Sequence, residues 1–481
     1  MSPLLVGIIV LGYFALLIAI SWFTGRDSSP DDFYTAHRQS PWYLVAFGMI
    51  GASLSGVTFI SVPGEVANSN FHYFQVVLGY LVGYLVIGTV LLPLYYRLNL
   101  VSIYTYLEQR FGFWSYKSGA FFFLVSRVIG ASFRLFLVAG VLQITFFDSF
   151  GLPFWVSVLT TIVLIWLYTF RGGIKTIVFT DTLQTAFMLI AVVVSIWFIK
   201  NQLNWSWAEL TSSLTDDSRT TIFNWDWQSK TNFFKQFFAG AFIAIVMTGL
   251  DQDMMQKNLT CRTIGEAQKN IFWFSVVLIF ANLLFLTLGV LLYQYAEAGS
   301  IVLPERTDNL FPFLAVEHFS TIGGVVFLLG ITAAAYSSAD SALTALTTSF
   351  CVDFLGFKSE NYQENKKLRM IIHFGFSVLL FIVILIFQGI NDQSVITSIF
   401  IAAGYTYGPL LGLFSFGILT KSNLKDKWVP IVCLVAPIIS YIINRNSVEW
   451  LGGYKFGFEI LILNGVLTFI GLSILVKRKK D

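Results

Sequence analysis

Residues 331–348 read ITAAAYSSADSALTALTT, and this stretch carries a carboxylate and several hydroxyls inside an apolar segment long enough to cross a bilayer. With about 3.6 residues per helical turn, its small and hydroxyl-bearing residues share one face. Polar groups in hydrocarbon are costly and usually mark an ion or solute path, although Ser and Thr in membrane helices also serve helix packing. Because a carboxylate accompanies the hydroxyls, we favour a functional site. The polar face consists of Ala334, Ser337, Ser338, Ser341, Thr344 and Thr348, with Asp340 one turn from Ser337.

The composition around this stretch is that of a protein that crosses the membrane many times. The 481 residues are 56% hydrophobic and only 12% charged, whereas soluble domains contain about 25% charged residues. The net charge of +3 gives no reason to expect nucleic acid as a partner. We expect the lipid bilayer and a small-molecule solute as partners, with the monomer as the functional unit. Runs of about 20 apolar residues predict an all-α membrane protein with about thirteen transmembrane helices, near residues 3–23, 41–64, 71–97, 118–146, 153–170, 177–200, 232–255, 270–296, 320–353, 367–389, 394–419, 427–445 and 456–476.

The placement of the 30 Lys and Arg residues predicts the orientation of the chain. Most of them, Lys257 included, fall in alternate loops and in the C-terminal tail 477–480, and loops rich in Lys and Arg stay in the cytoplasm. The pattern predicts a multi-pass protein of the plasma membrane, a bacterial inner membrane in particular, with the N-terminus outside and the C-terminus in the cytoplasm. The longest loop, 201–231, then lies outside.

Two of the expected spans contain helix-breaking residues. Residues 41–64 contain Gly56 and Pro63, and residues 232–255 contain Gly249. Interrupted segments at corresponding positions of two halves indicate an inverted-repeat transporter with its site near the bilayer midplane. We therefore expect a first inverted repeat at residues 41–200 and a second at 232–419, joined by an external loop at 201–231. An N-terminal helix with a cytoplasmic loop precedes them at 1–40, and two C-terminal helices with a basic cytoplasmic tail follow at 420–481.

Other polar residues in the spans have both a functional and a structural interpretation. Asp181 begins a span, where it is either a functional carboxylate or a helix N-cap, and we favour function. Arg127 and Arg134 share a helix face, and either could pair with a buried carboxylate. Asp251 and Asp253 are more simply explained as the end of their helix near the cytoplasm. Oxygen ligands without His or Cys clusters suit a hard cation, and the small number of carboxylates favours a monovalent one.

Four motifs occur in order along the chain: VSIYTYLEQRFG at residues 101–112, RGGIKTIVFTDTLQ at 171–184, GLDQDMMQKNLTCR at 249–262 and AAAYSSADS at 333–341. Together they give the chain a resemblance to the sodium/solute symporter family, which includes the sodium–glucose and sodium–sialic acid cotransporters. The resemblance extends over nearly the whole chain. It implies a leucine-transporter-type fold of two inverted repeats of five helices each, with Na⁺ as the coupling ion.

The resemblance also implies which residues bind the sodium ions and the solute. Asp340 stands where the sialic acid branch has a serine, and Arg134 matches the arginine that meets a carboxylate there if a short insertion follows Arg110. The main sodium site would use the backbone carbonyls of Gly51, Leu54 and Ala334 and the hydroxyls of Ser337 and Ser338. A second sodium site would use Asp181, Ser337, Asp340 and Ser341. The solute pocket would use Ser53, Ser55, Thr58, Phe74, Gln75 and Arg134.

The expected function is therefore sodium-driven import of a small organic solute by alternating access. Arg134 favours a carboxylate such as a sugar acid, a sialic acid or a monocarboxylate, while a neutral sugar, a polyol or an amino acid remains an alternative. A proton-coupled carrier would use the same carboxylates. An intramembrane enzyme is disfavoured, because the chain contains no GxSxG, HExxH or GxGD motif.

Overall fold

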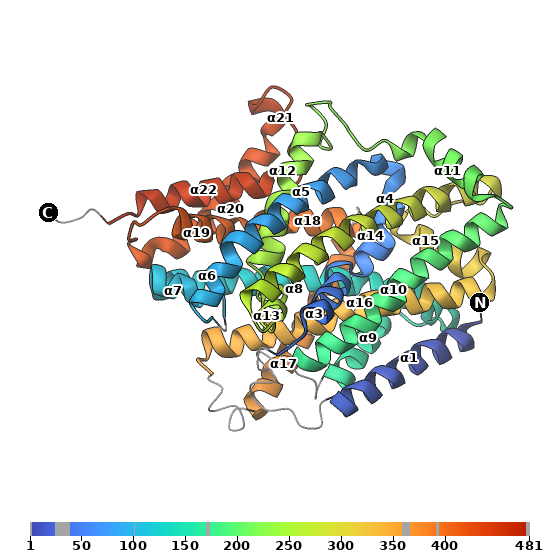
Figure 1. Cartoon of the computed structure of the whole chain (residues 1–481), viewed down its shortest axis with the longest axis horizontal. Coiled ribbons are helices and arrows are strands. Elements are labelled where there is room, and N and C mark those ends of the chain that lie inside the picture. Colours follow the sequence, from blue (N-terminus) through green and yellow to red (C-terminus); the bar gives the residue numbers. More distant parts are fainter. Residues whose placement is uncertain are drawn as a thin grey trace.

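The computed structural model describes residues 2–24, 39–100, 102–169, 174–357, 366–390 and 394–477. Within these ranges the chain folds into a bundle of helices, with two isolated β-bridges and no longer strand. The N-terminus lies on the side of the bundle that carries α11 (Trp207–Asp216), and the C-terminus lies on the opposite side (Figure 1). The expected all-α architecture is confirmed.

Most expected spans form helices close to the expected bounds. By length and composition, seven described helices can cross a membrane, or up to nine if each of two bent pairs is one span. The total of thirteen spans therefore stays a prediction. The unbroken helices are α1 (Pro3–Thr24), α8 (Phe113–Thr145), α9 (Phe154–Thr169), α10 (Ile174–Gln202), α14 (Ile264–Ala298), α16 (Thr321–Ser349), α17 (Lys366–Ile390), α20 (Val429–Arg445) and α22 (Ile460–Ile474).

Both predicted helix breaks are present. The first separates α3 (Trp42–Ser53) from α4 (Gly56–Ser69) at Leu54 and Ser55. The second follows α12 (Phe233–Ala244) and a π-helical turn, after which α13 (Gln252–Asn258) leaves at 70°. Both breaks free backbone groups from helical hydrogen bonds, and at the second break the hydroxyls of Tyr95 and Tyr104 donate to the carbonyls of Gly249 and Leu250.

A further bend was not predicted. It lies at Tyr407, between α18 (Val395–Thr406) and α19 (Gly408–Leu419), which differ in direction by 48°. Pro409 stands in the first turn of α19, and a proline there disfavours helical geometry at the residue before it. The Gly408–Pro409 pair was therefore a readable signal for this bend.

Close packing joins α5 (Tyr73–Val86), the helix after the first broken segment, to α12 of the second broken segment. The chain from α4 continues through α5 and a π-helical turn into α6 (Leu92–Arg97). A Cβ atom added at Gly79 of α5 would lie 2.0 Å from the carbonyl oxygen of Phe237 on α12, and one added at Gly240 would lie 2.1 Å from that of Val76. Only glycine permits this approach of the two backbones, so Gly79 serves packing, as small residues do between membrane helices.

The two ends of the bundle carry different elements. The α11 end carries residues 201–231, which follow the last turn of α10. The α13 end carries α13 and α7 (Thr105–Arg110) (Figure 1). Asp181 lies near the start of α10, and at about 1.5 Å per residue it is about 30 Å from the last residue of that helix. Groups that touch Asp181 therefore lie toward the α13 end.

Candidate functional site

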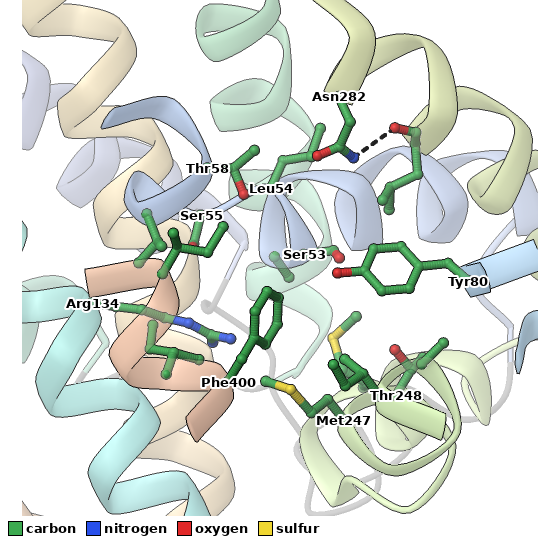
Figure 2. A pocket seen from close by; sticks show the side chains of 18 of the residues that line it. Ser53, Leu54, Ser55, Thr58, Tyr80, Arg134, Met247, Thr248, Asn282 and Phe400 are labelled. Carbon is green, nitrogen blue, oxygen red and sulfur yellow. Dashed lines mark hydrogen bonds between the residues drawn. The ribbon is translucent and has the colours of Figure 1, made fainter. Parts of the chain in front are cut away.

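A cavity of about 80 Å³ lies beside the break between α3 and α4, where α5, α8, α12, α14 and α18 converge (Figure 2). A cavity that holds one water molecule needs about 10–15 Å³, so this one has room for several waters or a small solute. Its wall combines hydroxyl, amide, aromatic and guanidinium groups. The residues labelled in Figure 2 are Ser53, Leu54, Ser55, Thr58, Tyr80, Arg134, Met247, Thr248, Asn282 and Phe400.

Four of the residues assigned to the solute pocket line this cavity, namely Ser53, Ser55, Thr58 and Arg134. Phe74 and Gln75 lie outside its wall. The amide of Gln75 donates to the carbonyl of Thr231 at 2.9 Å and accepts from the backbone N–H of Asn224 at 3.1 Å. Gln75 therefore fastens the 201–231 segment to α5.

The same helix contributes tyrosines to the cavity instead. Tyr73, Tyr80 and Tyr84 all line it, and the hydroxyls of Tyr73 and Tyr80 are 3.3 Å apart. Their spacing places them on one helix face. Three tyrosines on one face of an otherwise apolar segment were a signal that the sequence interpretation did not use.

The two arginines of α8 have different surroundings. Arg127 forms an ion pair with Asp253, and its Nη1 is 3.7 Å from the carboxylate of Asp251. Arg134 follows two turns later. Both arginines line the cavity, but no carboxylate of the described residues lies within ion-pair distance of Arg134. Its Nε is buried and has no hydrogen-bond partner in the described part of the chain. Figure 2 shows the guanidinium of Arg134 directed into the cavity beside Phe400.

Asp251 and Asp253 do more than end a helix near the cytoplasm, which is a correction to the interpretation that we favoured. Asp251 caps α13 by accepting from the backbone N–H groups of Asp253 and Met254. Both carboxylates are buried, and the hydroxyl of Tyr407 donates to Asp251 at 2.8 Å. With Arg127 they form a cluster that joins α8, α13 and the bend at Tyr407. We call these four residues the Arg127 cluster.

Toward the α11 end the cavity is separated from a larger one by a thin partition. The larger cavity has a volume of about 610 Å³ and is lined in part by Lys230 of the 201–231 segment. Tyr73, Ile396 and Phe400 line both cavities. The rings of Tyr73 and Phe400 are stacked, with centroids 6.2 Å apart. A molecule that passes from the larger cavity to the smaller one therefore meets these shared side chains.

The helix break provides carbonyl oxygens without helical partners. The backbone N–H of Leu54 donates to Ile50, but no backbone N–H of the described residues donates to the carbonyls of Gly51 or Leu54. A Cβ at Gly51 would lie 2.2 Å from the hydroxyl oxygen of Thr185, so α3 approaches α10 closely at this point. Carbonyls released in this way are typical cation ligands in transporters with broken helices.

The hydroxyl-bearing face of α16 packs beside this break, and Ala334, Ser337 and Ser341 on it are buried. The hydroxyl of Ser337 donates to Asp181 Oδ1 at 2.6 Å. The side chains of Ser338 and Asp340 lie outside the described part of the structure. Their roles therefore stay predictions from the sequence.

Lys257 was missed by the sequence interpretation, which placed it in a cytoplasmic loop. The structure places it on α13, where its side chain is only 2% exposed. Its Nζ is 2.8 Å from Asp181 Oδ2 and 2.7 Å from the hydroxyl of Ser341. The ammonium thus lies among three of the groups assigned to a second sodium ion, Asp181, Ser337 and Ser341. The signal available in the sequence was the spacing of Asp253 and Lys257, which continues a helix past the break.

Comparison with known proteins agrees with this arrangement. Residues 33–424 match the model of the sodium:solute symporter family. The chain is 25% identical over 485 residues to a sodium/sialic acid symporter, NanT, of Aliivibrio fischeri, covering 96% of this chain and 92% of that protein. It is also 25% identical over 428 residues to the human sodium/iodide cotransporter, covering 84% of this chain and 65% of that protein.

A solved structure of a sodium-coupled sialic acid symporter, in a substrate-bound outward-open state, superposes with a TM-score of 0.82. It shares 18% sequence identity, and the match covers 98% of both chains. Mhp1, a nucleobase-cation-symport-1 family transporter, matches with a TM-score of 0.54. These likenesses confirm the leucine-transporter-type fold. The chain therefore belongs to the sodium:solute symporter family, as a multi-pass membrane protein that couples the transport of a small solute to sodium and is not an enzyme.

Proposed function

We propose that the solute is a small organic carboxylate whose carboxylate group binds Arg134 in the cavity beside the helix break. The observation that carries this proposal is the guanidinium of Arg134, which lines the cavity and has no carboxylate partner among the described residues. Arg134 is half-buried and its Nε is fully buried, and a cation removed from water without a partner is disfavoured. A bound carboxylate would supply two parallel charge-assisted hydrogen bonds and remove that penalty.

The rest of the cavity wall suits a carboxylate that also carries hydroxyl groups. The lining also contains an aromatic ring, that of Phe400, and hydroxyl and amide groups that can form hydrogen bonds, those of Ser53, Ser55, Thr58, Thr248 and Asn282. The names of two relatives give sialic acid as the solute. A third relative, mouse sodium-coupled monocarboxylate transporter 1, is 26% identical over 422 residues. Sialic acids and monocarboxylates are both carboxylates at neutral pH. A sugar acid or a monocarboxylate is therefore the class that we favour over a neutral sugar, a polyol or an amino acid.

We propose further that one sodium ion binds at the break, between α3 and α16. Its ligands are the carbonyls of Gly51, Leu54 and Ala334 and the hydroxyls of Ser337 and Ser338. Carbonyl and hydroxyl oxygens suit a hard cation, and the carbonyls of Gly51 and Leu54 lack backbone donors in the described structure. Because Leu54 also lines the cavity, an ion that fixes the break also fixes the solute-binding wall.

For the direction of transport, we propose that the α11 end faces the outside of a plasma membrane, the inner membrane of a bacterium. The excess of Lys and Arg in the opposite loops supports this orientation. The same proposal includes a functional monomer. It also includes two inverted repeats, at 41–200 and 232–419, which are flanked by 1–40, 201–231 and 420–481. Solute then enters from outside through the 610 Å³ cavity, while the Arg127 cluster keeps the α13 end closed.

Binding measurements on the purified protein test the identity of the solute class. A panel should pair each carboxylate with its amide or alcohol analogue, in sodium and in potassium. We expect measurable binding only for carboxylates, at least tenfold tighter in sodium. Arg134→Gln should lose this binding, whereas Lys235→Gln, which changes a cation on α12 outside both cavity walls, should retain it. Equal binding of a neutral analogue, or full affinity in Arg134→Gln, would overturn the proposal.

A further inference from the structure

The second sodium position implied by the family resemblance is shaped around a side chain of the protein itself. Lys257 reaches from α13 to Asp181 on α10 and Ser341 on α16, with nitrogen–oxygen distances of 2.8 and 2.7 Å. Ser337 donates to the other oxygen of the same carboxylate. The ammonium and the carboxylate are both almost fully buried, at 2% and 0% exposure.

These contacts satisfy a buried cation in the way that a bound ion would be satisfied. An ammonium is a compact charge with three donors, and a carboxylate and a hydroxyl are two of the oxygen acceptors that it requires. Removing either the lysine or the aspartate would leave its partner as an uncompensated buried charge, which is the costly arrangement. The geometry therefore explains why Lys257 lies inside the bundle although its neighbours in the sequence approach a loop.

A sodium ion cannot share this position with the ammonium. Two unit positive charges about 4 Å apart repel by about 4 kcal/mol at an effective dielectric constant of about 20. That repulsion corresponds to roughly a thousandfold loss of sodium affinity. Of the groups that the resemblance assigns to a second ion, Asp181 and Ser341 already bind Lys257. The described residues therefore do not fit a second sodium ion while Lys257 stays in place.

We propose that the ammonium of Lys257 is a tethered cation that takes the place of a second sodium ion, so that this symporter carries one sodium ion per cycle. The proposal rests on the proposed function, in which the first ion binds at the helix break. Lys257 belongs to the chain and does not leave with the solute. One sodium ion that travels with one monocarboxylate therefore moves no net charge across the membrane.

The number of sodium ions bound to the purified full-length protein tests this directly, with radioactive sodium as the only probe. We expect one ion per wild-type protein. Lys257→Ala should bind two, because it vacates a position next to a carboxylate and two hydroxyls. Lys257→Arg keeps a cation and should bind one. Lys235→Ala is the matched control, since it removes another buried lysine of the same broken segment and should also leave one ion.

Two ions bound to the wild type would overturn the proposal, as would one ion in a folded Lys257→Ala protein. If Lys257→Ala does not fold, the double variant Lys257→Met with Asp181→Asn removes both charges at nearly constant volume, and it should bind one ion. Two ions in that variant would contradict the account. A wild type that binds no ion, with one gained in Lys257→Ala, would overturn the helix-break site and still support the role of Lys257.

Transport currents provide an independent readout. In liposomes that contain the wild type, sodium and a monocarboxylate together should give uptake without a current at any membrane potential. A current equal to one charge per solute would mean that two sodium ions accompany it, which contradicts the proposal.

Discussion

The Arg127 cluster should control how often the α13 end opens, and Arg127→Met tests this expectation. The substitution leaves Asp251 and Asp253 buried without their cation, although Tyr407 still donates to Asp251. Removing one partner of a buried ion pair costs about 3–5 kcal/mol. This cost applies only while α13 is packed against α8, because opening exposes both carboxylates to water. The closed arrangement should therefore lose roughly two to four orders of magnitude in its population relative to the open one.

Cys261 is a native reporter of this opening. It follows α13 by three residues, and its side chain is 0% exposed. With Cys351 and Cys433 replaced by Ala, a hydrophilic maleimide can react only with Cys261, and only when α13 has moved. The labelling rate then follows the population of the opened state. We expect at least a hundredfold faster labelling in Arg127→Met than in the parent protein.

The matched control is Arg134→Met, which removes a cation from the same helix face two turns away. Arg134 has no carboxylate within ion-pair distance among the described residues, so its removal leaves no buried anion. Labelling of Cys261 should stay within a few-fold of the parent rate. Equal labelling of the two methionine variants would refute the reasoning, because the ion pairs of Arg127 would then make no difference to closure.

Three further predictions concern the partition, the packing and the external segment. Phe400→Ala should speed solute association and dissociation together in stopped-flow binding, because Phe400 lines both cavities and stacks on Tyr73; unchanged rates would show that it is no barrier. Gly79→Ala should lower the free energy of unfolding by about 1–3 kcal/mol, seen as a lower melting temperature, because its Cβ meets a backbone oxygen at 2.0 Å. Gly130→Ala, whose Cβ meets nothing within 4 Å, should leave the melting temperature unchanged. The guanidinium of Arg219 donates to Asp217 and holds the pKa of that carboxyl below its usual range. The lowered pKa stabilises the folded segment at pH values above the usual aspartate pKa, and this stabilisation is lost as the pH falls through the lowered pKa. The hydrogen-exchange protection factors of residues 201–231 should therefore be constant from pH 5 to 8 and should fall only below about pH 4. A fall in protection near pH 6 would contradict this.

Much of the architecture could be predicted because hydropathy and glycine act locally. Apolar runs have to form helices in a membrane, and Gly56 and Gly249 mark both breaks within the sequence itself. The hydroxyls of Ser337, Ser341, Thr344 and Thr348 are buried within the bundle, as expected for polar groups that are costly in hydrocarbon. These features depend on short stretches of chain, and short stretches carry their own signal.

Features that depend on the reach of one side chain could not be predicted. Counting charges put Lys257 in a loop, yet its long side chain carries the ammonium back into the bundle to Asp181. The same limit applies to Arg127 and Arg134, which the sequence could not distinguish. Both arginines line the cavity, and only the position of α13 shows that Asp253 pairs with Arg127 and not with Arg134. Phe74 and Gln75 were assigned by resemblance, and a rotation of α5 by part of a turn gives the wall to its tyrosines instead.

The dependence of carboxylate affinity on sodium tests the central claim most directly. Linkage requires that an ion at the helix break and a solute at Arg134 raise each other's affinity by the same factor. Calorimetric titration of the purified protein with a bound carboxylate, at several sodium concentrations and constant ionic strength, measures that factor. We predict at least a tenfold increase in affinity as sodium replaces potassium, and an equal increase in sodium affinity at saturating carboxylate. An affinity that does not change with sodium would contradict the account.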